Sequence, residues 1–595
     1  MAKRVAASTR SKARAKVTAS IQSAPAASPV AEPVQDVFEL AGLIPELWRY
    51  HIDLWQRYFL FLDALRERAN NMLAHEQAGL PPVLTFEYET VLDARRFERP
   101  ANYVLLRITA AGDKCAEECV KEGNRPVIII DPRAGHGPGI GGFKRDSEVG
   151  IALHEGHPVY FVSFFPEPCP GQTLADVLNA LHRFVEEVIR RHPDAAPPVL
   201  YGNCQAGWAV AFLSADCDGL TGPAVLNGSP LSYWSGEEPV NPMRLAGGLV
   251  GGSWPARFFS DLGNGRFDGA WLAQNFENLN PAYAWWDKQY QLHANIDEER
   301  ERFLEFERWW GGFYFFSKEE ITAVVENLFI ANQPERGQMR GVCRLCEGCF
   351  LDLKRIRNPL VIFASSADNI TPPHQALGWI PVVYPDTQAL KAARQRIAYL
   401  LNPHVGHLGI FVSASVARFE HRAIFESLDE IEALKPGLYE MKILNPTGDP
   451  DCRKPQYTVA FKERKVEDIR FDYPRQAFET VYKASDFNSK LYEAFIGPWV
   501  RGLSMPWTAE ILKWLHPMRT SRYLYSERLN PWIGLIAMLA DGARHYRQRV
   551  GDDNPFQYAE MQWSRNISGE LDVYRDVRDG WLEQLFTWVY SPSSR

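Results

Sequence analysis

The spacing of apolar and polar positions changes along the chain, and each change marks a new kind of element. Over residues 36–78 apolar positions recur with helical periodicity on one broad face, which predicts an amphipathic helical segment. Over residues 79–230 short apolar runs alternate with helical ones, and the clearest strand-like runs are RPVIIIDP, HPVYFVSFF and PPVLYGNC. Such alternation predicts a mostly parallel sheet with helices on both faces.

The alternation stops at residue 231 and resumes at residue 342. Residues 231–341 combine helical stretches with Gly-rich loops and many aromatic side chains, so we expect an insertion that caps the C-terminal edge of the sheet. The strand-like runs NPLVIFASSADN and RIAYLLNPHVGH then complete the core over residues 342–436. The predicted fold class is therefore α/β, with a helical cap insertion.

Both ends of the chain differ from this core. Residues 1–35 are rich in Ala, Ser, Lys and Arg, with no acidic residue before Glu32. This composition predicts a disordered basic arm or, alternatively, an organellar transit peptide. Residues 437–595 open with a possible strand pair and continue as Trp- and Arg-rich helices, which we interpret as an additional, mainly helical C-terminal domain of unassigned role.

Composition and charge narrow the function classes. The chain has 595 residues, enough for two or three structural units, and its net charge of −8 argues against nucleic-acid binding. Nine cysteines in so long a chain do not form a disulfide scaffold. The sequence contains neither a secretory apolar segment nor a run of 18 apolar residues, so we expect a cytoplasmic protein.

Cys204 is the first candidate for chemistry, because it lies where a buried strand turns into a helix. Gly202, Ala206 and Gly207 keep that turn small, as a strained turn that presents a nucleophile requires. A helix from Gln205 onward would direct free N–H groups toward the sulfur, lowering its pKa and stabilising an oxyanion. The alternative is a small core residue beside a tight turn.

Asp368 and His407 are the candidate partners of Cys204. Each follows a predicted strand, and the order nucleophile, acid, histidine is that of α/β hydrolases. Taken separately, Asp368 could cap the helix that begins near TPPHQALGWI, and His407 could be an ordinary loop histidine, with His404 as a rival. The three residue types at three strand ends together favour a catalytic triad.

The Gly-rich segment DPRAGHGPGIGGFK follows the strand VIII and is the candidate for a second oxyanion donor, at the backbone of Arg133 or Ala134. Its spacing matches neither a Walker A loop nor a dinucleotide fingerprint, so we expect no cofactor. Lys144 and Arg145 could meet an anionic group of a substrate.

Cys343, Cys346 and Cys349 (in the segment CRLCEGC) have ligand-like spacing, but no nearby fourth ligand completes a familiar pattern, so we expect no metal.

Several short motifs resemble those of the polyhydroxyalkanoate synthase group of α/β hydrolases, above all its relatives that carry the DUF3141 domain. The resemblance covers roughly residues 100–415. GNCQAG at 202–207 is similar to the synthase box Gly-x-Cys-x-Gly-Gly, and EGHPVYFVSFF to a block of the form GH.VF.ISW. NQPERG with LDLKRIRNP, DNITP at 368–372 and GHLG at 406–409 resemble later synthase motifs in the same order.

The resemblance implies a poly(3-hydroxyalkanoate) synthase-like acyltransferase in which Cys204 attacks an acyl-CoA thioester, with His407 as general base. It further implies that Asp368 orients His407 or helps to activate a hydroxyl, and that the favoured substrate is a short or medium 3-hydroxyacyl-CoA. The chain departs from the synthases where Ala206 replaces a glycine and Asn369 replaces a histidine. Residues 437–595 have no counterpart in ordinary synthases.

Two other functions stay open. The same triad could serve a hydrolase (a thioesterase, an esterase or a polymer depolymerase) in which water takes the acyl group. Alternatively, the protein could be a non-catalytic accessory that uses its terminal helices to associate with a polymer granule or a membrane surface. The resemblance and the surplus of aromatic residues, with 18 Trp and 33 Phe, also suggest a homodimer.

Overall fold

The protein is described here by a computed structural model covering residues 33–109, 118–217, 219–236, 241–337, 339, 351–447, 456–469, 471, 473–551 and 553–591, with side chains from residue 43 onward. Two compact units can be separated by their internal contacts. The smaller comprises residues 1–55 with 547–561, and the larger comprises residues 56–546 with 562–595. In the smaller unit, Asp53 pairs with Arg547 at 2.7 Å, and the Tyr50 hydroxyl donates to Glu560 at 2.9 Å.

The larger unit contains a ten-stranded sheet in the order β1-β2-β4-β3-β5-β6-β9-β10-β11-β12. Its strands are β1 (Glu87–Asp93), β2 (Tyr103–Thr109), β3 (Val127–Ile130), β4 (Val159–Phe164), β5 (Val199–Asn203), β6 (Ala224–Asn227), β9 (Leu360–Ser365), β10 (Arg396–Asn402), β11 (Gly437–Thr447) and β12 (Gln456–Arg464). Pairing is parallel from β4 to β11 and antiparallel at both edges. The predicted, mostly parallel sheet is therefore confirmed.

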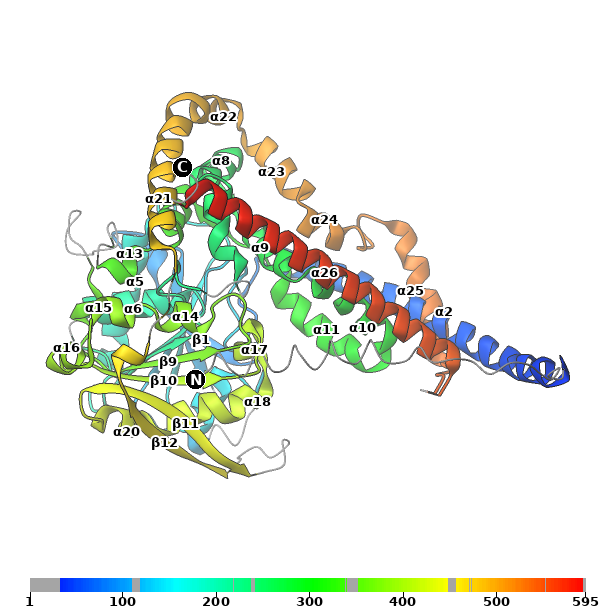
Figure 1. Ribbon diagram of the computed structural model, residues 1–595, viewed down its shortest axis with the longest axis horizontal. Helices are drawn as coiled ribbons and strands as arrows, with labels where there is room; N and C mark the ends of the chain where they lie inside the picture. The colour runs from blue at the N-terminus through cyan, green and yellow to red at the C-terminus, as the bar shows by residue number, and fades with distance from the viewer. Residues whose placement is uncertain are drawn as a thin grey trace, which may run out of the picture. The chain divides into compact units, whose positions relative to one another are not determined.

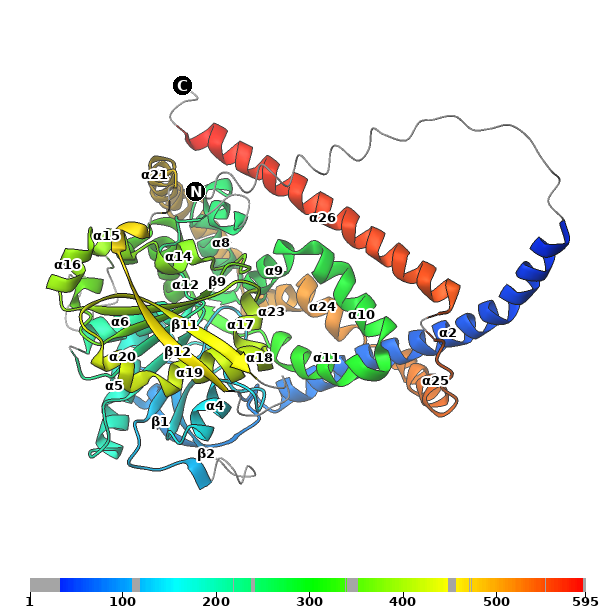
Figure 2. The same ribbon diagram turned by 60° about the horizontal axis from the view of Figure 1, so that its bottom comes forward.

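Helices cover both faces of the sheet, because alternate residues of each buried strand point to opposite sides. Ile128 and Ile130 of β3 belong to one apolar cluster, and Val127 and Ile129 belong to the other. The first cluster includes residues of α5 (Leu174–Arg191), α6 (Ala206–Asp216), α14 (Pro373–Leu377), α15 (Ile380–Val383) and α16 (Thr387–Ala392). The second includes residues of α4 (Glu148–His154), α17 (His407–Val412), α18 (Ala414–Val416), α19 (Arg422–Glu426) and α20 (Leu428–Ala433). This arrangement, visible in Figure 2, is the α/β-hydrolase fold.

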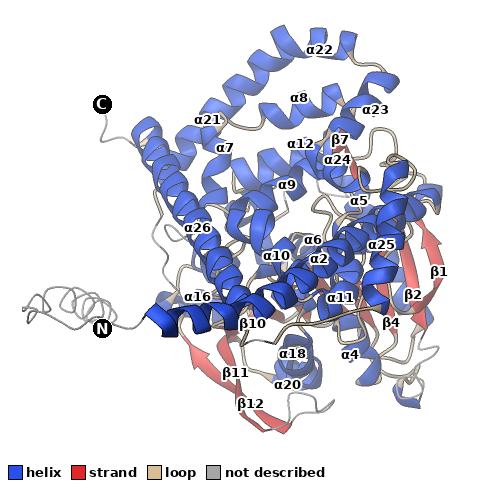
Figure 3. Cartoon of the chain, turned by 90° about the vertical axis from the view of Figure 1, so that its right-hand side faces the viewer, coloured by secondary structure: helices blue, strands red, loops and turns tan. Residues whose placement is uncertain are grey.

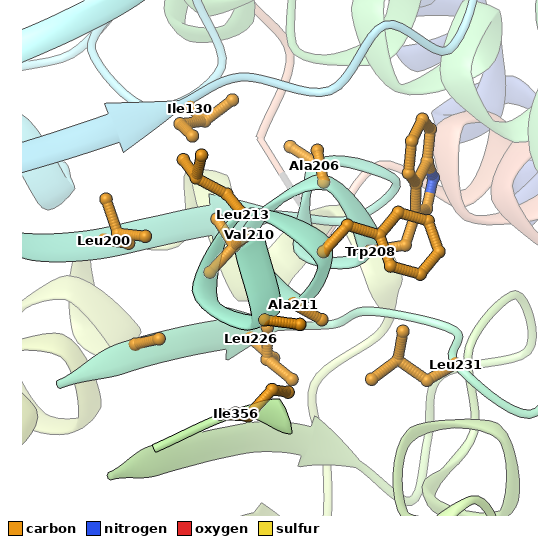
Figure 4. Packing of buried hydrophobic residues seen from close by; sticks show 14 of the residues in the cluster. Ile130, Leu200, Ala206, Trp208, Val210, Ala211, Leu213, Leu226, Leu231 and Ile356 are labelled. Atoms are coloured by element: carbon orange, nitrogen blue, oxygen red, sulfur yellow. The ribbon is translucent and has the colours of Figure 1, made fainter. Parts of the chain in front are cut away.

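Helix α6 is held firmly because it is mostly apolar and buried on every side. All of its residues are buried. Figure 4 shows Val210 and Leu213 packed beside Ile130 of β3 and Leu200 of β5. A helix that is apolar all round belongs in a protein core, and its burial fixes the turn that precedes it.

The segment between β6 and β9 is built mainly of helices. They are α7 (Ala246–Leu249), α8 (Trp254–Leu262), α9 (Ala270–Leu279), α10 (Lys288–Ala294), α11 (Ile296–Trp310), α12 (Lys318–Val324) and α13 (Gln333–Arg336). A short antiparallel pair, β7 (Arg266–Asp268) and β8 (Phe315–Ser317), joins them. In Figure 1, α9, α10 and α11 lie at one side of the main sheet.

The end of the chain differs from the predicted boundary. The expected strand pair after residue 436 is β11 and β12, and β11 pairs in parallel with β10, so the core sheet continues through Arg464. Further helices follow: α21 (Arg475–Leu491), α22 (Gly497–Leu503), α23 (Pro506–Leu515), α24 (Pro517–Tyr523), α25 (Gly534–His545) and α26 (Pro555–Tyr590). Near the other end, α2 (Pro33–Gln77) matches the predicted helical segment.

None of the helices in the described part of the chain combines the length and the apolarity that a membrane span requires.

Candidate active site

Cys204 lies on a strained turn between β5 and α6. Its φ of +50° is in the left-handed region, which a non-glycine residue rarely adopts. The flanking glycines leave no room for a side chain. A Cβ on Gly202 would lie 2.7 Å from Val210, and one on Gly207 would lie 1.8 Å from the Ser229 hydroxyl oxygen. The turn therefore needs the small residues that the sequence places around Cys204.

The structure brings the three predicted triad residues together at the C-terminal edge of the sheet. His407 Nε2 lies 3.1 Å from Cys204 Sγ, and His407 Nδ1 lies 2.7 Å from Asp368 Oδ2. Asp368 is fully buried, His407 is 6% exposed and Cys204 is partly exposed. The distances permit proton transfer between sulfur and imidazole, with the carboxylate fixing the ring on its other side.

The alternatives to this triad were Asp368 as a helix cap and His404 as a rival to His407. Asp368 Oδ1 accepts the N–H groups of Ile370 and Thr371, both at 2.8 Å, so this carboxylate holds its own loop as well as His407. It does not cap α14, whose N-cap position is Pro372. His404, the rival histidine, is exposed and donates its backbone N–H to Asn402.

The groups around His407 favour its protonated form. Burial of the His407 imidazole opposes protonation, but the neighbouring Asp368 carboxylate and the Cys204 sulfur outweigh burial. The pKa of His407 is therefore raised well above its ordinary value. The imidazolium form of His407 places a positive charge directly beside the sulfur of Cys204.

The structure separates the two candidates for the second oxyanion donor. Ala134 lines the same cavity as Cys204, whereas Arg133 is not among the lining residues. The Arg133 guanidinium is buried and pairs with Glu320 at 3.0 Å. On the other side of the sulfur, Gln205 immediately precedes α6, so its N–H belongs to a helix terminus, where such groups lack intrahelical partners. Within the described residues, we find no hydrogen bond from the backbone N–H of Gln205 or Ala134.

A cavity of about 330 Å³ opens beside Cys204 and His407. The core and the segment between β6 and β9 both line it, mostly with apolar and aromatic side chains that include Phe276, Leu279, Phe306, Trp309, Trp310, Ile370, Leu408 and Phe411. The imidazole of His136 stacks on Trp310, with ring centres 4.2 Å apart. Lys144 and Arg145 are not among the lining residues. The cavity is suited to an apolar chain.

Metal ligation was not expected from the sequence. Among the described residues, no group of three or more His, Cys, Asp or Glu side chains is placed to hold a metal ion. Cys343, Cys346 and Cys349 lie outside the described residues.

Sequence reasoning missed a buried polar network behind Cys204. The N–H of Cys204 donates to the carbonyl of Asn227 at 2.7 Å, and Asn227 Nδ2 donates to Asn203 Oδ1 at 3.0 Å. Asp131 and Glu148, both buried, lie beside these amides. Asp131, Asn203 and Asn227 occur at the ends of three neighbouring strands. Asp368 and His407 were chosen because each follows a predicted strand, and the same criterion could therefore have found these residues too.

Comparison with known proteins identifies a family. Residues 53–594 match the family model described as "Protein of unknown function (DUF3141)". A Rhizobium meliloti protein described as "Uncharacterized protein in ackA 5'region" is 41% identical over 558 residues, which cover 92% of this chain and 75% of that protein.

Solved structures share more distant likenesses. The Pyrococcus horikoshii acylaminoacyl peptidase is 16% identical over 61% of this chain, with a TM-score of 0.28, and only 43% of the peptidase is spanned. Carboxylesterase CesB of Bacillus subtilis is 14% identical over 61% of this chain and 98% of its own, with a TM-score of 0.32. The thioesterase domain from the curacin biosynthetic pathway is 11% identical over 57% of this chain and 99% of its own, with a TM-score of 0.30. These likenesses carry no argument about activity, and the fold assignment rests on the sheet itself.

Proposed function

The chain belongs to the DUF3141 family, and from the geometry of its site we propose that it is an acyl-transfer enzyme working through an acyl thioester on Cys204. The alignment of Cys204, His407 and Asp368 beside an apolar cavity carries this proposal. A non-catalytic accessory protein would have no use for a cysteine held at a strained φ of +50°. Strain of that kind persists where the surrounding structure enforces it, and it clusters at functional sites.

The proposed reaction begins with attack of the Cys204 thiolate on the carbonyl carbon of a thioester or ester. As the C–S bond forms, the carbonyl oxygen gains negative charge, which the N–H groups of Gln205 and Ala134 stabilise. The bond to the leaving group then breaks, and the departing thiolate or alkoxide takes the proton held on His407. The acyl group remains on Cys204 as a thioester.

Release of the acyl group needs an acceptor with an O–H bond. His407, now neutral, takes the proton of the acceptor while its oxygen attacks the acyl-enzyme. The Cys204 thiolate leaves, so the imidazolium–thiolate pair is restored. Water as acceptor makes the protein a hydrolase, which is the simplest form of the proposal.

A second candidate is transfer to a hydroxyl, with a short or medium 3-hydroxyacyl-CoA as the acyl donor. It is favoured by cysteine in place of the usual serine, because exchange between the thioester of coenzyme A and that of Cys204 is nearly balanced in energy. The apolar lining near the sulfur also favours an acceptor other than bulk water. This candidate corresponds to the polyhydroxyalkanoate synthase-like activity expected from the sequence.

The test is to mix purified protein with butyryl-CoA or 3-hydroxybutyryl-CoA and to follow free thiol release. Intact-mass spectrometry on the same samples would detect an acyl adduct. Wild type should release thiol and carry the adduct, Cys204→Ala should do neither, and His404→Ala should behave as wild type. Free acid as product identifies the hydrolase, and an oligomer identifies the transferase. Absence of release and adduct with acyl chains of several lengths would refute the thioester proposal.

A further inference from the structure

Helices α21, α22 and α23, with the π-helical turn Tyr492–Ile496, carry a row of exposed large apolar side chains that we call the apolar stripe. Its members are spaced four residues apart and are 43% to 77% exposed: Phe487, Leu491, Phe495, Trp499, Leu503, Trp507, Ile511 and Leu515. Figures 1 and 3 show α21 and α22 next to α8, with α23 following them. The stripe lies entirely within the larger unit.

Polar groups anchor these same helices to the rest of the protein. Ser253 donates its backbone N–H to the Ser485 hydroxyl at 2.9 Å, and its own hydroxyl lies 2.9 Å from that of Ser489. The Tyr492 hydroxyl donates to buried Asp261 at 2.9 Å. An ordinary surface helix buries its apolar side and exposes its polar side. Here α21 buries Ala477, Phe478 and Val481 on the side toward the protein, and the outer side still carries the large exposed side chains of the apolar stripe. This second apolar surface indicates that the stripe is covered by another surface.

The exposed area suits a stable protein interface. Side chains of this size and exposure present together on the order of 1,000 Å² of apolar surface. Monomeric proteins rarely expose contiguous apolar patches of more than a few hundred Å², and a standard interface buries roughly 800 Å² on each partner. Such a patch needs its partner whenever the chain is folded, and a second copy is the partner always present in equal amount. We propose that the apolar stripe is the interface between two copies of this chain.

The charges near the apolar stripe distinguish a protein partner from a lipid surface. Helices that lie on membranes carry an excess of Lys and Arg on their polar face. Here the neighbouring charges form balanced pairs within the chain: Lys490 with Asp486, Arg501 with Glu493 and Lys513 with Glu510. In addition, rows of side chains four residues apart are the ridges that pack into the grooves of a second helix.

The test is sedimentation equilibrium of the full-length protein. Wild type should sediment at twice its chain mass of 67.7 kDa. The double variant Trp499→Glu/Leu503→Glu should sediment as a monomer with an unchanged far-ultraviolet circular dichroism spectrum. Leu220→Glu, an exposed leucine outside the stripe, should remain dimeric. A monomeric wild type, or a double variant that stays dimeric, would overturn the proposal. So would wild type that co-sediments with phosphatidylcholine vesicles and loses this binding in the double variant.

A second, independent observation concerns two carboxyl groups buried together behind Cys204. Asp131 directly follows β3 and is 3% exposed, whereas Glu148 is the first residue of α4 and is fully buried. Asp131 Oδ1 and Glu148 Oε2 lie 3.1 Å and 3.2 Å from the position that a Cβ on Gly141 would take. The two carboxyl groups therefore crowd the same glycine, and the mechanism above uses neither of them.

The two groups connect the Gly-rich loop with the turn at Cys204. Asp131 accepts the N–H groups of Gly139 at 2.5 Å and Gly141 at 3.1 Å, in the loop that carries Ala134. Glu148 Oε1 accepts from Asn227 Nδ2 at 3.3 Å. Because the carbonyl of Asn227 accepts the N–H of Cys204, the residue before Gln205, the segments that carry both proposed oxyanion donors are tied to this acid pair.

Two carboxylates this close in a buried site resist joint ionisation. Burial raises the pKa of Glu148 well above its ordinary value and that of Asp131 to about 6. Asp131 faces two N–H donors, which favour its ionised form. His421 Nε2 lies 3.4 Å from Glu148 Oε1, but burial lowers the pKa of His421 to about 4, so this ring is neutral near pH 7. The Tyr201 hydroxyl lies beside His421 and is neutral as well.

We infer that Glu148 holds a proton while Asp131 holds the charge, and that this pair acts as a positioning device for the backbone of Ala134 and Cys204. This inference rests on the proposed function. Loss of the negative charge on Asp131 would release the Gly-rich loop, whereas a neutral amide in place of protonated Glu148 would change little.

The test compares Glu148→Gln and Asp131→Asn, with Glu335→Gln as a control for a buried acid elsewhere. Deprotonation of Glu148 should lower the kcat of wild type at alkaline pH. Glu148→Gln should keep kcat within about 3-fold of wild type at neutral pH and lose that part of the fall. Asp131→Asn should lower kcat roughly 10- to 100-fold with little change in KM. Equal losses in the two variants, or full activity in Asp131→Asn, would overturn the inference.

A measurement without turnover separates this inference from the proposed function. A raised pKa means that the folded state binds a proton that the unfolded state has lost. The contribution of Glu148 to the free energy of unfolding should therefore fall as pH rises above about 4.3, the ordinary Glu pKa. The free energy of unfolding of wild type minus that of Glu148→Gln should fall over this range, and a difference that does not change with pH would contradict the inference. Absence of turnover in wild type would instead refute the proposed function alone.

Discussion

The sheet around Cys204 and the helices that carry the apolar stripe differ in where their large apolar side chains lie. In the sheet, apolar side chains fill both faces, and polar groups gather at the strand ends around Cys204, His407 and Asp131. In α21–α23 Phe478 and Val481 are buried against the protein, yet the large apolar side chains of the stripe face outward. The core therefore satisfies its own packing, whereas the stripe leaves an apolar surface that we propose a second copy covers.

Loss of the Asp368 carboxylate, which belongs to the polar groups at the strand ends, should have the greatest effect on activity. Asp368→Asn would replace the carboxylate that holds His407 with an amide and would favour the wrong ring tautomer. We expect kcat to fall roughly 10²- to 10⁴-fold, while the sedimentation behaviour stays that of wild type. Steady-state thiol release would measure kcat, and sedimentation equilibrium would measure the oligomeric state. A simultaneous change in oligomeric state would show that the two regions are not independent.

Two leucines, one from each region, allow the regions to be compared by the free energy of unfolding. Leu213 of α6 is fully buried, and Leu503 of the apolar stripe is 77% exposed. Leu213→Ala should lower the free energy of unfolding by about 2–5 kcal/mol, because it leaves a cavity in a packed core. Leu503→Ala should cost less than about 0.5 kcal/mol in the monomer obtained by dilution. Urea denaturation of both variants at low protein concentration would measure this difference, and equal costs would contradict the comparison.

The smallest expected effect is the pH dependence that His407 contributes. Its pKa is raised in the folded state, so the stabilisation is fully present below the unfolded pKa of about 6.5 and is lost as pH rises through the folded pKa. His407→Gln should therefore cost stability at pH 6 and progressively less toward alkaline pH. Urea unfolding of both proteins across pH 6–9 would measure the trend. A cost that grows with pH would contradict the raised pKa.

Much of the candidate site could be predicted from local sequence, because strand ends and turns have local signatures. Cys204 stands among small residues after an apolar run, and Asp368 and His407 follow two further runs. Parallel strands bring their carboxyl ends to one edge, so the order along the chain already implies proximity. The choice between Arg133 and Ala134 could not be made this way. It depends on which of the two lines the cavity beside Cys204, and the cavity is formed by segments distant in the chain.

Local sequence is enough to place strands and helices and the residues that end the strands around Cys204, since apolar periodicity and turn chemistry act over a few neighbouring residues. Contacts between distant residues place β11 in the main sheet and the acid pair behind Cys204. Such contacts also leave the apolar stripe of α21–α23 facing outward. Periodicity identifies the apolar face of a helix, but contacts between residues distant in the chain determine what that face meets.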